Sequence, residues 1–371
     1  MFMEWYEVLN AEAIDSPALL LYPERIQANI QRMIDIVDGD VHRLVPHIKT
    51  HKLGEIVKMQ LDAGITRFKC ATIAELEMAL EAGAPWVLIA YQLVGPKVDR
   101  FLAVQRAYPK AELFSLCDDL GAAIVLAEKH QAAGLTAKVY LDINNGQNRT
   151  GRPLEQGTQD LYQKLSRIPG LVIQGLHVYD GHIRNQDFHE RKMASDAAFA
   201  PVMSLVQDLE QAGYPRPEII TAGSPAFTSA SLRTEVFCSP GTTLLWDYGY
   251  AHLVEEARMR WAAVLLCRVV SKPAPGLVTV DLGHKAVAAE NPLSKRIHFL
   301  NLSGYEPVGQ SEEHLVLKVD QADRLQVGDI LYGIPQHVCP TVALYDQAHI
   351  IRRHIWEDTW EVTARRRMIT C

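Results

Sequence analysis

The sequence predicts an α/β fold in which a (βα)8 TIM-type barrel is followed by a C-terminal antiparallel β domain. Over residues 17–240, short apolar runs alternate with longer amphipathic runs, a rhythm typical of parallel strands covered by helices on both faces. From about residue 246 the runs become short and β-like, and Gly, Pro and Asp turns separate them. A chain of 371 residues has room for both parts.

The barrel prediction rests on the number of apolar runs before residue 240. There are nine, whereas a (βα)8 barrel closes with eight, so we expect the first run to leave the barrel. A proline that begins the run 23–37 and a glycine that ends the run 73–83 are typical helix signals. The strand-like runs are 18–22, 43–48, 67–72, 86–91, 112–117, 138–143, 171–178, 218–222 and 235–239.

The chain is therefore expected to divide into three segments. Residues 1–22 form an N-terminal segment that joins the β domain, residues 23–245 form the barrel, and residues 246–371 form the β domain. The β-like runs of the last segment are 258–272, 276–283, 314–320, 328–335 and 341–346.

Composition excludes several classes of protein. Hydrophobic residues make up 48% of the chain and charged residues 22%, as in a soluble globular protein. The net charge of −7 speaks against a nucleic-acid partner or an anionic membrane surface. The first residues lack the pattern of a signal peptide, and the apolar runs are too short to span a bilayer. The six cysteines have no CxxC spacing, so we expect free thiols and a cytoplasmic location.

Polar residues follow several of the predicted strands, at the barrel face where active sites form. Lys49 follows the run 43–48 within the stretch "VPHIKTHK". Arg149 follows the run 138–143, and His177 and Tyr179 lie near the end of the run 171–178. Gly223-Ser224 and Gly241-Thr242 follow the last two runs, where glycine and hydroxyl groups suit a phosphate, although ordinary turns use the same residues.

Lys49 is a candidate nucleophile. A lysine at a strand end, opposite a phosphate-binding loop, suggests an imine with pyridoxal 5'-phosphate, because burial lowers the pKa of an amine and exposes its lone pair. The alternative is one of many solvated surface lysines. Lys52 is the weaker candidate because it precedes the next helical run.

A long ordered set of motifs resembles one family. The chain is similar to fold-type III pyridoxal-phosphate enzymes with an alanine-racemase-like barrel, and among them to the D-threonine aldolase and D-serine dehydratase family. The motifs are "PHIKTHK", "FKCATIAELEMALEAG", "LDINNGQNRTG", "GLHVYDGH", "AGSPAF", "SPGTTLLWDYGY", "DLGHKA", "SEEHL" and "IPQHVCPTVALYD".

The resemblance implies a role for each candidate residue. Lys49 would form the imine, His177 would pack on the cofactor ring, and Arg149 would approach its phenolic oxygen. Alanine racemases carry an arginine that faces the pyridine nitrogen, and Ser239 stands in that place here, which speaks against racemase chemistry. Tyr179 is also expected to bind the cofactor. The residues expected to bind its phosphate are Gly223, Ser224, Gly241 and Thr242.

The "HVC" stretch is a candidate metal site. If it were a strand, His337 and Cys339 would point to the same side, and imidazole with thiolate suits zinc or a similar ion. A lone HxC is usually coincidence, but the resemblance matches this pair to the family's metal ligands, for zinc, manganese or magnesium. Family aldolases often carry aspartate at the second position and dehydratases cysteine, so Cys339 leaves the reaction open.

The resemblance implies a lyase whose substrate is a small molecule, a β-hydroxy-D-amino acid. The first expectation is retro-aldol cleavage to glycine and an aldehyde, with His182 or His177 as base. The alternative is D-serine dehydratase chemistry, in which Lys49 removes the α-proton and a keto acid and ammonia result. A racemase is the third possibility, and a vitamin B6 carrier is disfavoured by the C-terminal domain. Relatives of this fold type usually form homodimers.

Overall fold

The computed structural model describes residues 3–370, apart from the side chain of Gln156. Contacts between residues divide the chain into two compact units, each described separately below. Of the described residues, the barrel unit comprises 33–49, 54–241 and 366–370, and the β unit comprises 3–32, 50–53 and 242–365.

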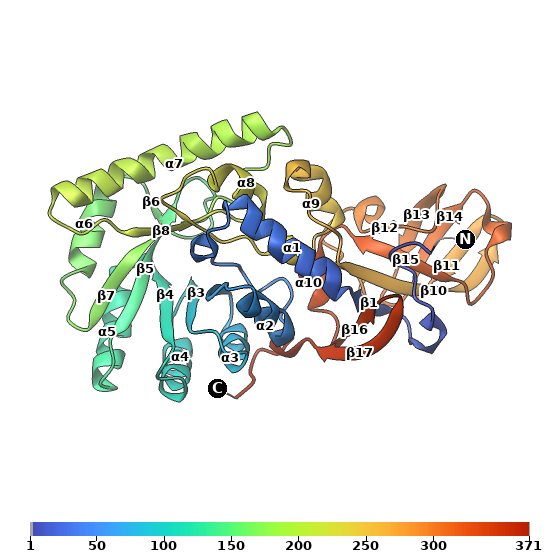
Figure 1. Ribbon diagram of the computed structural model, residues 1–371, viewed down its shortest axis with the longest axis horizontal. Coiled ribbons are helices and arrows are strands. Elements are labelled where there is room, and N and C mark those ends of the chain that lie inside the picture. The colour runs from blue at the N-terminus through green and yellow to red at the C-terminus, as the bar shows by residue number, and fades with distance from the viewer. Residues whose placement is uncertain (1–2, 371) are drawn as a thin grey trace. The chain divides into compact units, whose positions relative to one another are not determined.

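The barrel unit is built on a parallel sheet whose strands follow one another in sequence order (Figure 1). Its interior is filled by alternate residues of neighbouring strands, among them Leu88, Phe114 and Tyr140. The strands are β2 (Arg67–Cys70), β3 (Trp86–Gln92), β4 (Glu112–Cys117), β5 (Ala137–Asn144), β7 (Leu171–Val178), β8 (Glu218–Thr221) and β9 (Phe237–Cys238), and β6 (Arg152–Pro153) pairs with β5.

Residues 44–48 close this sheet into a barrel. On one side Val45 donates a backbone hydrogen bond to Cys238 of β9, and His47 donates one to Pro240, just beyond that strand, both at 2.8 Å. On the other side Ile48 donates to Lys69 of β2 at 2.8 Å. The run predicted as the first barrel strand is reduced to two isolated bridges, because Pro46 has no N–H to donate. Together with β2–β5 and β7–β9 it makes up the eight strands predicted, so the fold class is confirmed.

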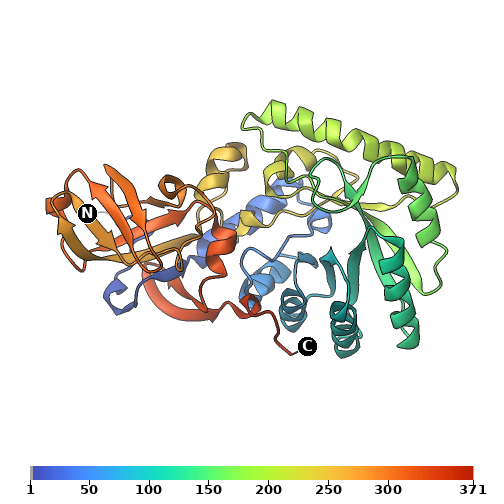
Figure 2. The same cartoon turned by 180° about the vertical axis from the view of Figure 1, so that it is seen from behind.

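Helices run along the outside of the barrel strands, as both views show (Figure 1, Figure 2). Side chains cap the first turns of three of them: Thr72 accepts from the N–H of Glu75, and Asp119 and Asp187 cap the helices that follow them. The helices are α2 (Gly54–Asp62), α3 (Ile73–Glu81), α4 (Pro96–Ala107), α5 (Leu120–Ala132), α6 (Gln156–Leu165), α7 (Phe188–Gln211) and α8 (Phe227–Ala230). Helix α1 (Pro23–Ile36) precedes them.

The β unit contains a second, mostly antiparallel sheet. Strand β1 (Ala18–Leu21) pairs antiparallel with β10 (Ala263–Ala274) and parallel with β16 (Gln347–Arg352), so the first apolar run of the chain lies in this sheet. The other strands are β11 (Leu277–Val280), β12 (Ile297–Phe299), β13 (Tyr305–Gln310), β14 (Leu315–Val319), β15 (Ile330–Pro335) and β17 (Ile355–Glu361).

One predicted strand of the β unit is wrong. Of residues 341–346, expected as a β-like run, the first two end the short helix α10 (Val338–Val342) and the rest form a turn. His337 is the extended residue that precedes this helix. Helix α9 (Tyr248–Leu253) is the other α-helix described within residues 242–365. Among residues 3–370, no helix has both the length and the apolar character needed to cross a bilayer.

Candidate active site

A cavity of about 480 Å³ lies at the carboxyl ends of the barrel strands. Strand geometry explains which residues reach it: Tyr140 of β5 packs in the barrel core, and Asp142, two residues on, points to the same side and lines the cavity. The size is typical of a small-molecule site. The lining includes Lys49, Lys69, Asp142, Arg149, His177 and Tyr179.

Lys49 lies at the end of the segment that closes the barrel. Its side chain is exposed and lines the cavity, and its backbone N–H donates to Nδ1 of His47 at 3.3 Å. The structure thus gives Lys49 a solvent-accessible amine inside a concave site, which is what a reagent entering from solvent requires.

His177 is held by a carboxylate. Its Nδ1 lies 2.7 Å from Oδ1 of Asp142, and the two residues stand side by side in the register of β5 and β7. Both side chains are buried. Burial, and then the charge of Lys69, lower the pKa of His177, so its ring is neutral at neutral pH. A neutral, fixed imidazole is suited to packing against a flat ring.

Arg149 and Tyr179 line the same cavity. The guanidinium carbon of Arg149 lies 5.0 Å from the centroid of the Tyr179 ring, a cation–π arrangement. Two glycines leave room for this ring: a Cβ at Gly181 would lie 2.5 Å from it, and a Cβ at Gly223 would lie 2.6 Å from it. Tyr179 therefore connects the arginine side of the cavity with the first glycine loop.

The two glycine loops are joined to each other in the barrel unit. The N–H of Gly241 donates to Oγ of Ser224 at 3.0 Å, and the N–H of Gly223 donates to Oδ1 of Asp180 at 3.1 Å. Burial raises the pKa of Asp180 to about 6, although the Gly223 N–H opposes this. A short 3₁₀ helix begins at Ser224 in the first loop. Thr242, the residue after Gly241, belongs to the β unit, and a second short 3₁₀ helix begins there. The loops thus combine backbone N–H groups, hydroxyls and helix starts.

Gly223→Ala tests the packing of Tyr179 on the first loop. The added methyl would overlap the ring, so we expect the unfolding free energy to fall by about 1–3 kcal/mol. Thermal unfolding monitored by circular dichroism measures this. Gly309→Ala is the control, because its Cβ would meet nothing closer than 4.0 Å. Equal melting temperatures for the two variants would contradict the predicted overlap.

His182 lies apart from the residues that line the cavity. It is exposed, and a Cβ at Gly146 would lie 2.9 Å from its Nε2. Burial lowers its pKa. The structure therefore groups Lys49, Arg149, His177 and Tyr179 around one cavity and leaves His182 beside the loop at Gly146.

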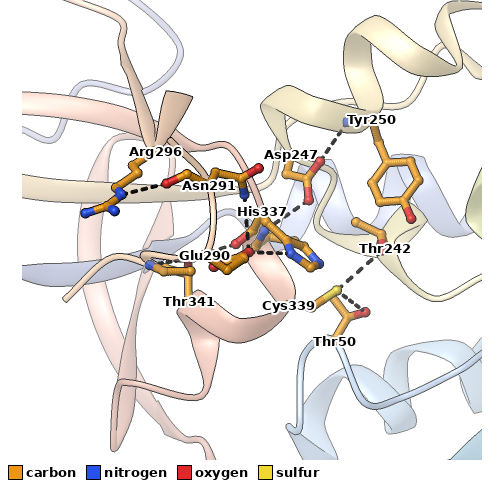
Figure 3. Close-up of polar contacts among 12 residues, drawn as sticks. Thr50, Thr242, Asp247, Tyr250, Glu290, Asn291, Arg296, His337, Cys339 and Thr341 are labelled. Carbon is orange, nitrogen blue, oxygen red and sulfur yellow. Dashed lines mark hydrogen bonds and ion pairs between the residues drawn. The ribbon is translucent and has the colours of Figure 1, made fainter. Parts of the chain in front are cut away.

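His337 and Cys339 belong to a polar cluster in the β unit (Figure 3). Nδ1 of His337 lies 2.7 Å from Oε1 of Glu290, which leaves Nε2 as the nitrogen available to an ion. Sγ of Cys339 lies 3.1 Å from Oγ1 of Thr50 and 3.5 Å from Oγ1 of Thr242. His337 and Cys339 lie near each other because His337 is an extended residue at the start of helix α10, which contains Cys339. The sequence suggested instead that both lie in a strand.

The charges in this cluster favour a cation. Burial opposes a proton on His337, but hydrogen bonds to Cys339 and Glu290 and the negative charges of Cys339 and Asp247 raise its pKa to about 9. Within residues 3–370, no group of three or more His, Cys, Asp or Glu residues is arranged to hold a metal ion. Two protein donors would therefore need water or substrate to complete a coordination shell, which is typical of catalytic ions.

Several site residues were missed by sequence reasoning, although a signal existed for some. Lys69 and Asp142 are charged residues inside predicted strands, and each stands between two apolar residues in "RFKC" and "YLDI". Such a residue is buried only with a partner, which marks it for attention. Asp180 had a signal of its own, because it is a polar residue just after the predicted strand 171–178. Glu290 and Thr50 had none, because only the folded chain brings them to His337 and Cys339.

Comparison with known proteins agrees with this geometry. Residues 22–248, more than half of the chain, match the family described as "Alanine racemase, N-terminal domain". The chain belongs to this family. Residues 262–351 also match a second family, described as "Putative serine dehydratase domain". The resemblance inferred from the motifs is thereby confirmed.

Curated relatives of this alanine racemase-type chain are lyases. A D-threonine aldolase from Arthrobacter is 29% identical over 95% of this chain and 93% of its own length. A 3-hydroxy-D-aspartate aldolase from Paracoccus denitrificans is 27% identical, covering 96% of this chain and 94% of its own. A D-threo-3-hydroxyaspartate dehydratase from Delftia is 24% identical, covering 94% and 97%.

A solved structure agrees with the fold. The D-threonine aldolase from Filomicrobium marinum superimposes with a TM-score of 0.86 and 27% identity, covering 95% of this chain and 96% of that one. The alanine racemase-type barrel and the antiparallel β sheet are therefore the architecture of a known lyase structure.

The described residues fit both groups that this family implies. Pyridoxal phosphate is an anionic, aromatic aldehyde, and the barrel cavity offers it amines, a guanidinium and a neutral imidazole. The glycine loops of the same unit add backbone N–H groups and a hydroxyl. A borderline divalent ion suits the imidazole and thiolate of the β unit, where surrounding carboxylates supply negative charge.

Proposed function

We propose that this protein is a pyridoxal-phosphate- and divalent-metal-dependent lyase that cleaves β-hydroxy-D-amino acids to glycine and an aldehyde. The observation that carries the proposal is the cavity in which Lys49 lies with Arg149 and the His177–Asp142 pair. The names of the aldolase relatives support it, since they match this chain over nearly its whole length.

In this proposal the barrel unit binds the cofactor. Lys49 supplies the amine that links to it, Arg149 and Tyr179 bind the phenolic side, and Gly223, Ser224, Gly241 and Thr242 bind the phosphate. Bound pyridoxal phosphate supplies an electron sink for the bond that breaks at the substrate's α-carbon. His177 orients the ring, because Asp142 fixes its tautomer and Lys69 occupies its second nitrogen.

The β unit contributes the second group. His337 and Cys339 would hold a divalent cation that acts as a Lewis acid toward the substrate's hydroxyl group. Glu290 orients the imidazole through Nδ1, as carboxylates do for metal-binding histidines. We assign no residue as the base for the hydroxyl proton, because both ring nitrogens of His177 already have protein partners. His182, the other candidate, lies outside the cavity lining, beside Gly146.

A dehydratase is the second candidate function. Cys339 favours it, and so does the match of residues 262–351 to a serine dehydratase domain. In that reaction Lys49 would remove the α-proton, and a cation held by His337 and Cys339 would supply Lewis-acid assistance to the loss of hydroxide. The products would be a keto acid and ammonia.

Product analysis distinguishes the two. Purified protein is incubated with pyridoxal phosphate and D-threonine, D-serine or a 3-hydroxy-D-aspartate, with Mn²⁺, Zn²⁺ or Mg²⁺ and with a chelator. Glycine plus aldehyde supports the aldolase, and keto acid plus ammonia supports the dehydratase. Formation of the L-amino acid alone would indicate a racemase and contradict both.

A further inference from the structure

Lys69 is an ionisable residue in the barrel interior. In the proposed function it has no assigned direct contact with the cofactor. It lies at the end of β2, only 1% exposed, yet it lines the cavity that contains Lys49. Its Nζ is hydrogen-bonded to Oγ of Ser239 and lies 3.4 Å from Nε2 of His177. A lysine with two fixed polar partners in a cavity wall is a built feature, because burying an amine costs free energy.

The direction of each hydrogen bond can be derived. The carboxylate of Asp142 accepts from Nδ1 of His177, so Nε2 of this neutral ring carries no proton and accepts from Lys69. The Ser239 hydroxyl lies 3.1 Å from the carbonyl oxygen of Thr221 and donates to it, so its oxygen accepts from Lys69. The amine therefore donates twice.

One hydrogen-bonding position of the Lys69 amine remains in either protonation state. A charged amine has a third N–H, and a neutral amine has a lone pair. Burial, and then the charge of Lys49, lower the pKa of Lys69 to about 7, against the carboxylates of Asp142 and Asp180. Arg149 also lowers it, and the Tyr179 ring lies 5.5 Å away. Both states are therefore populated near neutral pH.

The polar atoms of pyridoxal phosphate indicate which atom could bind the remaining hydrogen-bonding site of the Lys69 amine. In the proposed function Lys49 takes the aldehyde, Arg149 the phenolic oxygen and the glycine loops the phosphate, which leaves the pyridine nitrogen. We propose that Lys69, held by Ser239, is the positioning residue that hydrogen-bonds the pyridine nitrogen of pyridoxal phosphate and orients His177. The inference rests on the proposed function. A lysine in this place gives the ring nitrogen a partner that donates when charged and accepts when neutral, whereas an arginine only donates.

Lys69→Met tests this inference, with pyridoxal phosphate as the probe. We measure its dissociation constant and the pH dependence of its absorption on the protein between pH 5.5 and 9. Wild type is expected to show a change in absorption near pH 7 that Lys69→Met lacks, with at least tenfold weaker binding. Lys69→Arg should bind like wild type but lose the change, because guanidinium stays charged. Lys58→Met, which removes an exposed lysine of α2, is the control.

The outcomes separate the inference from the proposed function. If wild type binds no pyridoxal phosphate, or Lys49→Ala keeps the lysine-bound band, the proposed function fails and this inference fails with it. If those two behave as expected but Lys69→Met has wild-type affinity and pH profile, the inference alone is overturned. Should Lys69→Met not fold, Ser239→Ala replaces it: a shifted absorption change supports the inference, and an unshifted one overturns it.

Discussion

Lys49→Ala is expected to lose the absorption band of lysine-bound pyridoxal phosphate and to lower activity by roughly 10⁴-fold or more, since it removes the nucleophile. The cavity places its exposed amine beside a neutral histidine and an arginine, so the substitution removes the linking group without a change in the barrel core. Absorption spectra and steady-state kinetics with saturating pyridoxal phosphate measure the two effects.

Lys52→Gln is the matched control for the lysine. Lys52 lies three residues on, belongs to the β unit and was the weaker candidate from sequence. We expect its band to match that of wild type. If the band is lost in Lys52→Gln but kept in Lys49→Ala, the assignment of the cofactor lysine is wrong, while the cofactor itself remains supported.

His337→Ala and Cys339→Ala are expected to lower metal affinity by more than about 100-fold, because each removes one of two protein donors. Activity should then no longer respond to added Mn²⁺, Zn²⁺ or Mg²⁺. Glu290→Gln should have an intermediate effect, about 10–100-fold, since it disturbs only the carboxylate that orients the imidazole through a 2.7 Å contact. Equilibrium dialysis followed by elemental analysis measures the affinity.

Comparing the metal affinities of these variants distinguishes a ligand of the ion from a residue that only orients a ligand. His314→Ala is the control, because His314 is an exposed imidazole of the same unit. Wild-type affinity in His337→Ala would remove the metal from this cluster. An effect of Glu290→Gln as large as that of His337→Ala would instead make the carboxylate a ligand of the ion.

The sequence by itself determined the two kinds of sheet and the main candidate residues. Alternating apolar and amphipathic runs indicate parallel strands with covering helices. This pattern is local, so it can be recognised from the sequence alone. The rule that barrel sites form at the carboxyl ends of strands then selected Lys49, Arg149, His177 and Tyr179. The structure groups these four around one cavity.

Only the tertiary structure decided which distant residues meet. Asp142 reaches His177 because β5 and β7 pair in one register, and a shift by one residue would turn the carboxylate to the other face. Lys69 reaches Ser239 because residues 44–48 close the barrel between β2 and β9, despite Pro46. His337 and Cys339 meet through a helix start, where the sequence suggested a strand. Register, ring closure and the exact end of a strand depend on packing between segments far apart in the chain, and no local pattern encodes them.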